Sequence, residues 1–255
     1  MEVDKTWYLK KRIFSITNTS NTDISWFPEI EILGDIKNIL KQLLKKWNGG
    51  NEWNQECIDN FKYNLYNSFK YNMENCLPFQ IIKKLRSIVL RDYIVSCDTG
   101  AHKLLFAQVW KSYCPNSFFV SNGLSTMGYG ISAALALKLH FPNRQVICIT
   151  GDGGFLMNLH EIATAVRLNL PIVVIVFSDG SLSLIRVIQE RKGYLPSGVD
   201  FDKPNFVHLA ESFGAKGENV FSIKDFELSL KDSLSEKIPV ILNVHINPSE
   251  YKFLI

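Results

Sequence analysis

From residue 93 onward, short apolar runs alternate with segments of helical periodicity, and this alternation limits the folds open to the chain. Strand-like runs are expected at 93–97, 118–121, 145–150, 172–177 and 240–245. Helical patterns are expected at 103–110, 131–139, 159–170, 206–213 and 226–234. The fourth apolar run has no polar interruption, which is typical of a strand covered on both faces. The alternation predicts an α/β fold: a doubly wound, mostly parallel sheet with helices on both faces.

The first 75 residues predict a separate, smaller piece of structure. Residues 12–16 and 29–33 read as short strands, and Gly34-Asp35 as a turn that caps a helix over 36–47. This is too little to bury an independent core, so we expect it to dock on the rest or to belong to a domain whose beginning is absent. Residues 48–75 are polar, aromatic and rich in Asn, and we expect a linker followed by an irregular helical stretch.

Composition excludes several classes of protein. The net charge of +3 is too small and too scattered to indicate a nucleic-acid partner. No apolar run approaches the ~20 residues that cross a bilayer, and the N-terminus lacks the apolar stretch of a signal peptide. The five cysteines form no CxxC pair, so we expect buried, reduced thiols. We therefore expect a cytoplasmic globular protein without membrane or nucleic-acid partners.

The candidate binding segments are the loops that follow the strands, because ligands of open parallel sheets bind beyond the carboxyl ends of the strands. Glycine and small polar residues crowd 98–102, 121–130, 151–155 and 178–181. In the third segment, glycines surround Asp152 just before a helical pattern. Glycine N–H groups can approach a phosphate, but a bare carboxylate would repel it. A Mg²⁺ ion between them resolves the conflict, since Mg²⁺ commonly bridges carboxylates to phosphates.

A second carboxylate, Asp179, lies 27 positions after Asp152, which is the length of one α/β unit. If the two strands are neighbours, both carboxylates reach the same edge of the sheet. Either Asp alone could be a helix cap or a turn former, but the pair on adjacent units favours a metal site. The P-loop pattern and the GxGxxG dinucleotide fingerprint are both absent.

Gly151-Asp152-Gly153 followed by Asp179 resembles the thiamine diphosphate motif of the pyruvate oxidase and acetolactate synthase superfamily. The stretch 121–185 and the segment CDTGAHK look like the cofactor-binding domain of acetolactate synthase, and Asp at 179 looks most like the flavin-independent, catabolic branch. The resemblance covers roughly 76–250. It implies that 1–47 is the C-terminal remnant of a central domain, 48–75 a linker, and 76–255 the thiamine diphosphate-binding domain.

The resemblance also implies a role for each matching residue. Asp152, Asp179 and the backbone carbonyl of Ser181 would hold Mg²⁺, and Gly153, Gly154 and the 99–102 loop would cradle the diphosphate. Met127 would prop thiamine into its bent shape, with its N–H and the carbonyl of Ser125 bonding the aminopyrimidine. Taken alone, Met127 would be a core methionine and His102 a core or surface histidine. The expected cofactor-binding set is Thr99, Gly100, Ala101, His102, Ser125, Met127, Gly151, Asp152, Gly153, Gly154, Asp179 and Ser181.

The activity implied by the resemblance is the condensation of two pyruvates to 2-acetolactate with loss of CO₂, a transferase reaction that depends on thiamine diphosphate and Mg²⁺. Many synthases carry a Trp after the metal loop that favours a larger second substrate, and 184–189 has none. The family's Glu that protonates the aminopyrimidine N1′ lies on an N-terminal domain, contributed by the other subunit of a dimer, for which this chain has no room.

We therefore expect no catalytic residue in this chain and no turnover by it alone. A homo-oligomer or a complementary subunit would supply the pyrimidine-binding domain. Two alternatives stay open. The chain could belong to another thiamine diphosphate-dependent 2-keto acid decarboxylase or carboligase, or it could be a non-catalytic remnant that pairs with a full-length synthase.

Overall fold

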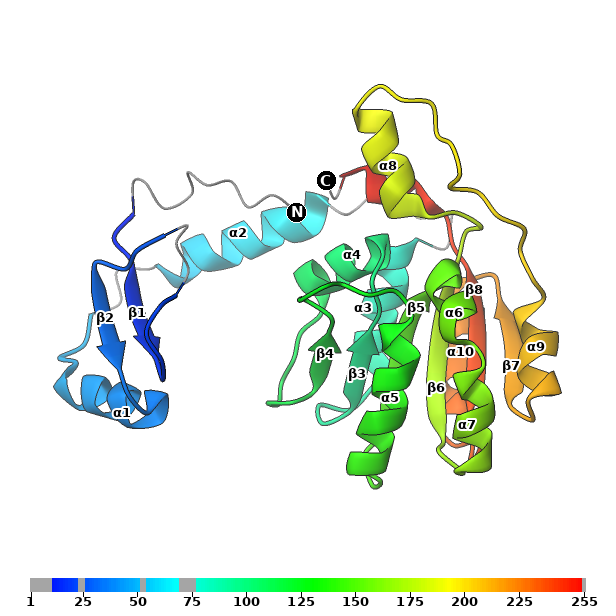
Figure 1. Cartoon of the computed structure of the whole chain (residues 1–255), viewed down its shortest axis with the longest axis horizontal. Helices are drawn as coiled ribbons and strands as arrows, with labels where there is room; N and C mark the ends of the chain where they lie inside the picture. Colours follow the sequence, from blue (N-terminus) through cyan, green and yellow to red (C-terminus); the bar gives the residue numbers. More distant parts are fainter. Residues whose placement is uncertain (1–10, 23–25, 51–53, 69–76, 254–255) are drawn as a thin grey trace. The chain divides into compact units, whose positions relative to one another are not determined.

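The computed structural model describes residues 11–22, 26–50, 54–68 and 77–253, and the chain divides into two compact units, Met1–Tyr63 and Asn64–Ile255. The first unit holds a parallel pair of strands, β1 (Phe14–Thr17) and β2 (Ile30–Leu33), and helix α1 (Ile36–Lys46) (Figure 1). Asp35 caps α1 by accepting the N–H of Asn38 at 2.8 Å, which confirms the predicted turn and cap. Helix α2 (Gln55–Ser68) lies in the stretch expected to be linker and irregular helix.

The second unit is built on a sheet of six strands, all parallel, in the order β4-β3-β5-β6-β8-β7. The strands are β3 (Ile94–Cys97), β4 (Phe118–Val120), β5 (Val146–Gly151), β6 (Ile172–Ser178), β7 (Lys216–Val220) and β8 (Val240–His245). Five of them match the predicted apolar runs, and the predicted fold class is confirmed.

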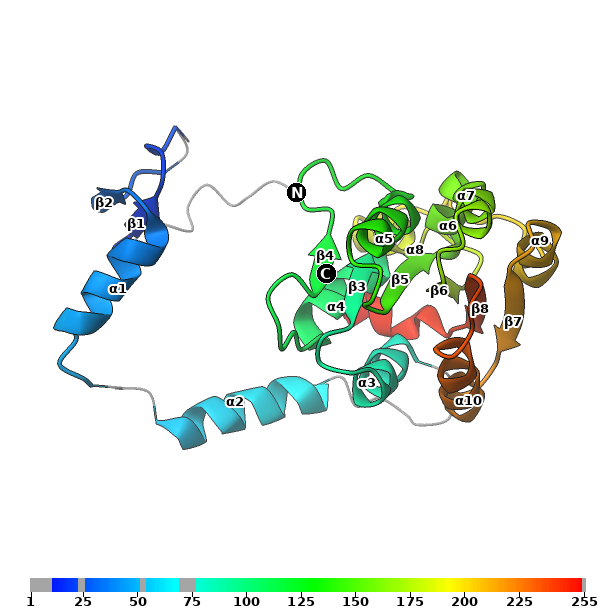
Figure 2. The ribbon, with the colours of Figure 1, turned by 90° about the horizontal axis from the view of Figure 1, so that it is seen from below.

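Helices cover both faces of this sheet (Figure 2). One face carries α5 (Tyr129–His140), α6 (Asp152–Asn158), α7 (Glu161–Arg167) and α9 (Phe206–Ser212). The other carries α3 (Pro78–Ile88), α4 (Ala101–Val109) and α10 (Ile223–Ser233). Side chains of each strand alternate between two cores, so that in β5 Ile147 packs on one side and Cys148 on the other. Every residue of β6 is buried, as expected for a strand covered on both faces.

Several boundaries differ from the predictions for identifiable reasons. The helix expected over 159–170 is preceded by α6, so the glycine-rich segment after β5 forms a helical turn and not a loop. Strand β7 was not predicted because its sequence, KGENV, is polar and contains a glycine. Helix α8 (Ser183–Arg191) and the 3₁₀ turn η1 (Pro248–Phe253) were not predicted either.

The cysteines follow the expectation in part. Cys97 and Cys148 are free and buried, whereas Cys57 is free and exposed, so the predicted burial is wrong there. Its helix α2 is mostly exposed along the described side chains, which leaves the thiol no core to enter. Cys76 lies outside the described residues. Within the described ranges, no helix is both long and apolar enough to cross a membrane.

Candidate functional site

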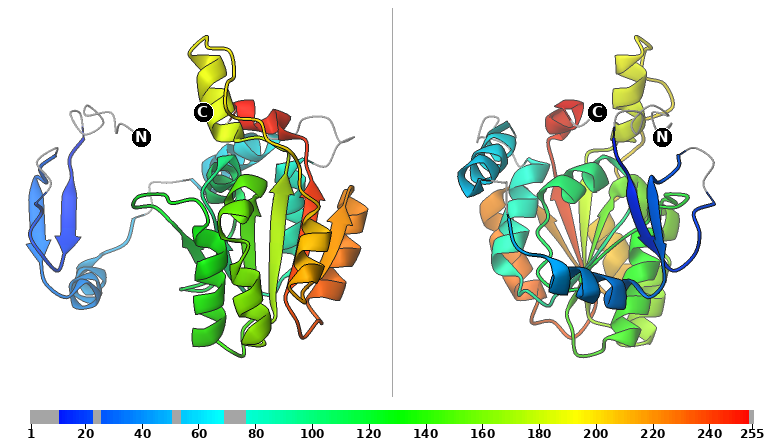
Figure 3. Two further views of the ribbon diagram at one scale, coloured as in Figure 1. Left: turned by 45° about the vertical axis from the view of Figure 1, so that its right-hand side comes forward. Right: turned by 90° about the vertical axis from the view of Figure 1, so that its left-hand side faces the viewer.

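The strand order places a topological switch point between β3 and β5. From β3 the chain moves to β4 on one side, and then returns to β5 on the other. Doubly wound sheets bind ligands at such a point, beyond the carboxyl ends of the strands. Helix α8 and the turn η1 lie at this end of the sheet (Figure 3). The switch point is therefore where a ligand site is expected.

A cavity of about 230 Å³ occupies this place. Every position of the predicted cofactor-binding set lines it: Thr99, Gly100, Ala101, His102, Ser125, Met127, Gly151, Asp152, Gly153, Gly154, Asp179 and Ser181. Six more lining residues were missed from the sequence, namely Phe177, Leu182, Ser183, Leu184, Ile185 and Tyr251. Most of the six come from α8 and η1, the elements that were not predicted.

Asp152 and Asp179 meet because β5 and β6 are neighbours in the sheet, with Gly151 paired to Phe177. One carboxylate oxygen of Asp152 accepts the backbone N–H groups of Asp179, at 2.9 Å, and of Gly180, at 2.7 Å. Asp179 accepts the hydroxyl of Ser183 at 2.6 Å. The two strands are thus neighbours, as the prediction that both carboxylates reach the same edge of the sheet requires.

Both carboxyl groups are perturbed by their surroundings. Burial raises the pKa of Asp152. Burial, with a smaller contribution from the charge of Asp152, raises the pKa of Asp179 to about 6. A cation between the two carboxylates would favour their ionised forms and so offset the effect of burial on their pKa values. Groups of three or more His, Cys, Asp or Glu side chains suited to a metal are absent from the described part of the chain, so such a cation would need further oxygen ligands from the backbone or from a bound molecule.

Three helices, α4, α6 and α8, begin at residues that line the cavity. None of the three has a side-chain hydrogen bond at its N-cap, and in the first turn of α6 the N–H of Gly153 donates to Asp152 at 2.9 Å. The first N–H groups of a helix have no partner within the helix, and they favour an anion. Alternation of strand and helix around one switch point thus places three helix N-termini at the same cavity.

Side chains pack closely on two glycines of the cavity wall. A Cβ atom on Gly100 would lie 2.6 Å from Cε1 of His102, and one on Gly153 would lie 2.9 Å from Cδ2 of Leu182. A side chain at either position would therefore have to displace its neighbour. Such a surface brings N–H groups near a ligand that a side chain would keep away.

Two buried polar atoms of lining residues have no hydrogen-bond partner, Oγ1 of Thr99 and Nε2 of His102. Burial lowers the pKa of His102 to about 4, which keeps the imidazole neutral at pH 7. Unpartnered buried polar atoms are uncommon and call for a ligand or water. Together with the glycine wall and the paired carboxylates, these atoms fit a diphosphate with its metal ion.

Part of the cavity lining is apolar. Ser125 has the left-handed value φ = 51°, rare for a residue other than glycine, two residues before Met127. The Met127 side chain reaches the glycine turn, with Cε 3.4 Å from the Cβ position of Gly153. Leu182, Leu184 and Ile185 also line the cavity. The cavity thus combines polar and apolar lining residues.

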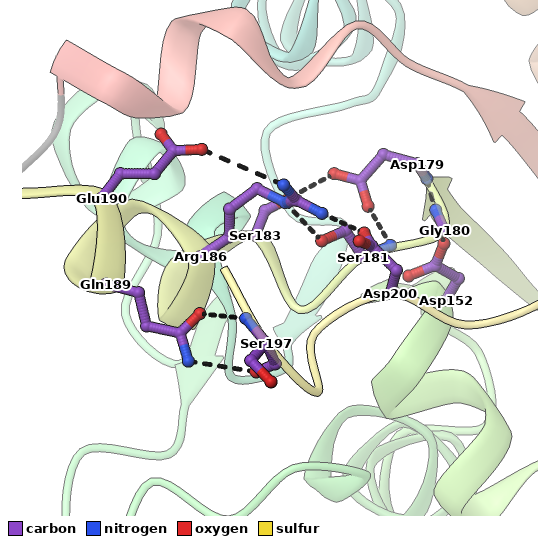
Figure 4. A network of polar contacts seen from close by, with 10 residues as sticks. All are labelled: Asp152, Asp179, Gly180, Ser181, Ser183, Arg186, Gln189, Glu190, Ser197 and Asp200. Carbon is purple, nitrogen blue, oxygen red and sulfur yellow. Dashed lines mark hydrogen bonds and ion pairs between the residues drawn. The ribbon is translucent and has the colours of Figure 1, made fainter. Parts of the chain in front are cut away.

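The loop that carries Asp179 and Ser181 is braced by a second segment (Figure 4). The N–H of Leu182 donates to the carbonyl of Val199 at 2.8 Å, and the N–H of Phe201 donates to Gly180 at 3.1 Å. Arg186, on α8, donates to the hydroxyl of Ser181 at 3.1 Å and pairs with Asp200. Asp152 on one side and this segment on the other hold the loop in place.

Comparison with known proteins agrees with this geometry. The family described as thiamine pyrophosphate enzyme, C-terminal TPP binding domain, matches residues 98–244. The chain is 32% identical over 241 residues to a probable acetolactate synthase large subunit of Methanococcus aeolicus, covering 87% of this chain and 40% of the relative. It is 30% identical over 239 residues to an acetolactate synthase of Bacillus subtilis, covering 91% and 42%.

A third relative is the acetolactate synthase isozyme 2 large subunit of Escherichia coli, which is 29% identical over 224 residues, covering 87% of this chain and 40% of the relative. The chain spans about two fifths of the length of the curated relatives it matches. The family match includes five of the six strands of the sheet and most of the residues that line the cavity. The chain belongs to the thiamine pyrophosphate enzymes and carries their C-terminal TPP-binding domain.

Proposed function

We propose that this chain binds thiamine diphosphate through Mg²⁺ in the switch-point cavity, as the cofactor-binding part of an acetolactate synthase. The observation that carries the proposal is the cavity itself. It joins the buried carboxylate of Asp152, the partly buried carboxylate of Asp179, a wall of glycines and apolar side chains, from segments far apart in the sequence.

In this proposal each group of lining residues has its own task. Asp152, Asp179 and the carbonyl of Ser181 hold the metal ion. The glycine turn at 151–154 and the 99–102 segment hold the diphosphate, to which Thr99 Oγ1 and His102 Nε2 offer their unused bonding capacity. Met127 supports the thiamine rings, and the backbone of Ser125 and Met127 orients the aminopyrimidine.

Thiamine diphosphate, when bound, supplies the carbon nucleophile and the electron sink for decarboxylation of a 2-keto acid. The residues of this chain bind and orient it and exclude water from its diphosphate end. Among the described residues that line the cavity, Asp152 and Asp179 are the only carboxylates, and the proposal uses both for the metal. The Glu that acts on N1′ is therefore proposed to come from a pyrimidine-binding domain outside this site, in a partner subunit or a complementary chain.

The proposed substrates are two pyruvates, which makes the enzyme a transferase that forms 2-acetolactate. The absence of Trp from 184–189 supports pyruvate as the second substrate. The flavin-independent, catabolic type is supported by Asp at 179. A cytoplasmic location and an oligomeric enzyme stay predictions from the sequence.

A product assay tests the proposed reaction. The chain is mixed with a separately expressed pyrimidine-binding domain of a related synthase, Mg²⁺, thiamine diphosphate and pyruvate. We expect 2-acetolactate, and we expect none when either protein is left out. Turnover of other 2-keto acids without 2-acetolactate would instead support another decarboxylase or carboligase. If the cofactor binds and no keto acid is consumed, the non-catalytic alternative is favoured.

A further inference from the structure

Asp98, the residue directly after β3, is fully buried and lies outside the set of residues that line the cavity. One carboxylate oxygen accepts the N–H of Thr99 at 2.7 Å. The other accepts the N–H of Gly128 at 3.0 Å and the hydroxyl of Thr150 at 2.9 Å. A single side chain therefore bonds three segments that are distant in the sequence.

These three segments are the ones that carry most of the proposed cofactor contacts. Thr99 begins the 99–102 segment, Gly128 directly follows Met127, and Thr150 directly precedes the glycine turn. The turn itself packs on Asp98, because a Cβ atom on Gly154 would lie 2.6 Å from the Asp98 carboxylate oxygen. Asp98 thus stands behind the cavity wall, at the point where its parts meet.

Burying the Asp98 carboxyl group without an ion pair costs free energy, which points to a role beyond packing. None of the ion pairs among the described residues includes Asp98, so its charge is balanced by hydrogen-bond donors. Burial raises the pKa of Asp98, and the hydrogen bonds from Thr99, Thr150 and Gly128 act in the opposite direction. Hydrogen bonds to a charged group are about twice as strong as neutral ones, so a carboxylate fixes the three segments more firmly than a neutral side chain would.

We infer that Asp98 is a positioning residue for the cofactor: its carboxylate sets the spacing between the diphosphate segment, the Met127 segment and the glycine turn. This inference rests on the proposed function. It predicts that changing Asp98 reduces cofactor affinity although the side chain does not line the cavity.

The test is Asp98→Asn in the full chain, with thiamine diphosphate titrated calorimetrically in the presence of Mg²⁺. Asparagine keeps the size of the side chain but has only one acceptor oxygen. That oxygen can accept the N–H of Thr99 or that of Gly128 but not both. The NH₂ group of the asparagine then faces the remaining backbone N–H, which has no acceptor. We expect the affinity to fall by about ten- to a hundredfold, since a buried donor left without an acceptor costs about that much.

Ser96→Ala is the matched control. Ser96 lies on the same strand, is fully buried, and donates its hydroxyl to the carbonyl of Gly130 at 2.8 Å, near the start of α5. The variant removes a buried hydrogen bond at the same helix and leaves in place the three bonds that Asp98 accepts from Thr99, Gly128 and Thr150. We expect a lower midpoint of thermal unfolding but an affinity within about twofold of the wild type. If both variants weaken binding equally, Asp98 has only a structural role and the inference is overturned.

A second pair of variants decides the matter if Asp98→Asn does not fold. Thr150→Val removes the hydroxyl that donates to Asp98, and Thr150→Ser keeps it. We expect several-fold weaker binding for the valine variant and near-wild-type binding for the serine variant. Equal affinities would overturn the inference. The wild-type titration is read separately, because absence of binding by the unchanged chain contradicts the proposed function itself, whereas equal binding by wild type and variants contradicts only the role of Asp98.

Discussion

Asp152→Ala should abolish the binding of thiamine diphosphate in the presence of Mg²⁺. The variant loses a proposed metal ligand and leaves the neighbouring Asp179 carboxylate alone beside the proposed diphosphate position. It also frees the N–H groups of Gly153, Asp179 and Gly180 that the carboxylate accepts. Removing one member of a buried charged site costs about 3 kcal/mol or more, which corresponds to at least about a hundredfold in affinity.

The matched control for this experiment is Asp200→Ala. Asp200 belongs to the same polar network through Arg186, but it is exposed and does not line the cofactor cavity. Asp200→Ala removes the ion pair with Arg186 but leaves the backbone bonds of Leu182 and Phe201 that brace the loop. We therefore expect it to bind within about threefold of the wild type, because exposed ion pairs contribute little. Thermal unfolding of both variants shows that each is folded. Unchanged binding by a folded Asp152→Ala would show that the metal lies elsewhere.

Cofactor binding should weaken as the pH falls below about 6, and Asp179→Asn should move this decline to lower pH. The metal requires the ionised carboxylate. Burial, more than the charge of Asp152, raises the pKa of Asp179 to about 6, so the carboxylate is ionised at pH 7.5 and mostly protonated at pH 5. Each unit of pH below this value should therefore reduce the affinity by about tenfold. Asparagine offers a neutral amide oxygen, which Mg²⁺ accepts and which does not titrate.

The measurement is a series of calorimetric titrations between pH 5 and pH 8 for the wild type and Asp179→Asn. The affinity of each protein at lower pH is compared with its own affinity at pH 7.5. In this way a lower affinity of the variant at every pH, caused by the lost charge, is distinguished from a change in its pH dependence. Identical pH profiles for the two proteins would mean that Asp179 is not the group that titrates.

The sequence predicted which positions lie together where the spacing along the chain determines it. Asp152 and Asp179 are separated by one α/β unit, and such units place consecutive strands side by side, so the two carboxylates had to meet if β5 and β6 were neighbours. The glycine turn and Met127 were predicted from the resemblance to the family's cofactor-binding domain. All the predicted positions line one cavity.

The parts that could not be predicted depend on tertiary contacts. Asp98 is a single carboxylate in a loop, and its three partners become visible only when β3, α5 and β5 are assembled. The brace of Arg186 and Asp200 joins α8 to a segment without periodicity. Strand β7 takes its place at the edge of the sheet by pairing with β8, in spite of a polar sequence.

The central claim, that this chain binds thiamine diphosphate through a metal ion, is tested most directly by titrating the cofactor into the wild-type chain with and without Mg²⁺. We expect saturable binding, about one cofactor per chain, in the presence of Mg²⁺, and loss of that binding when EDTA removes the metal. Absence of binding under both conditions, or equal affinity with and without Mg²⁺, would contradict it.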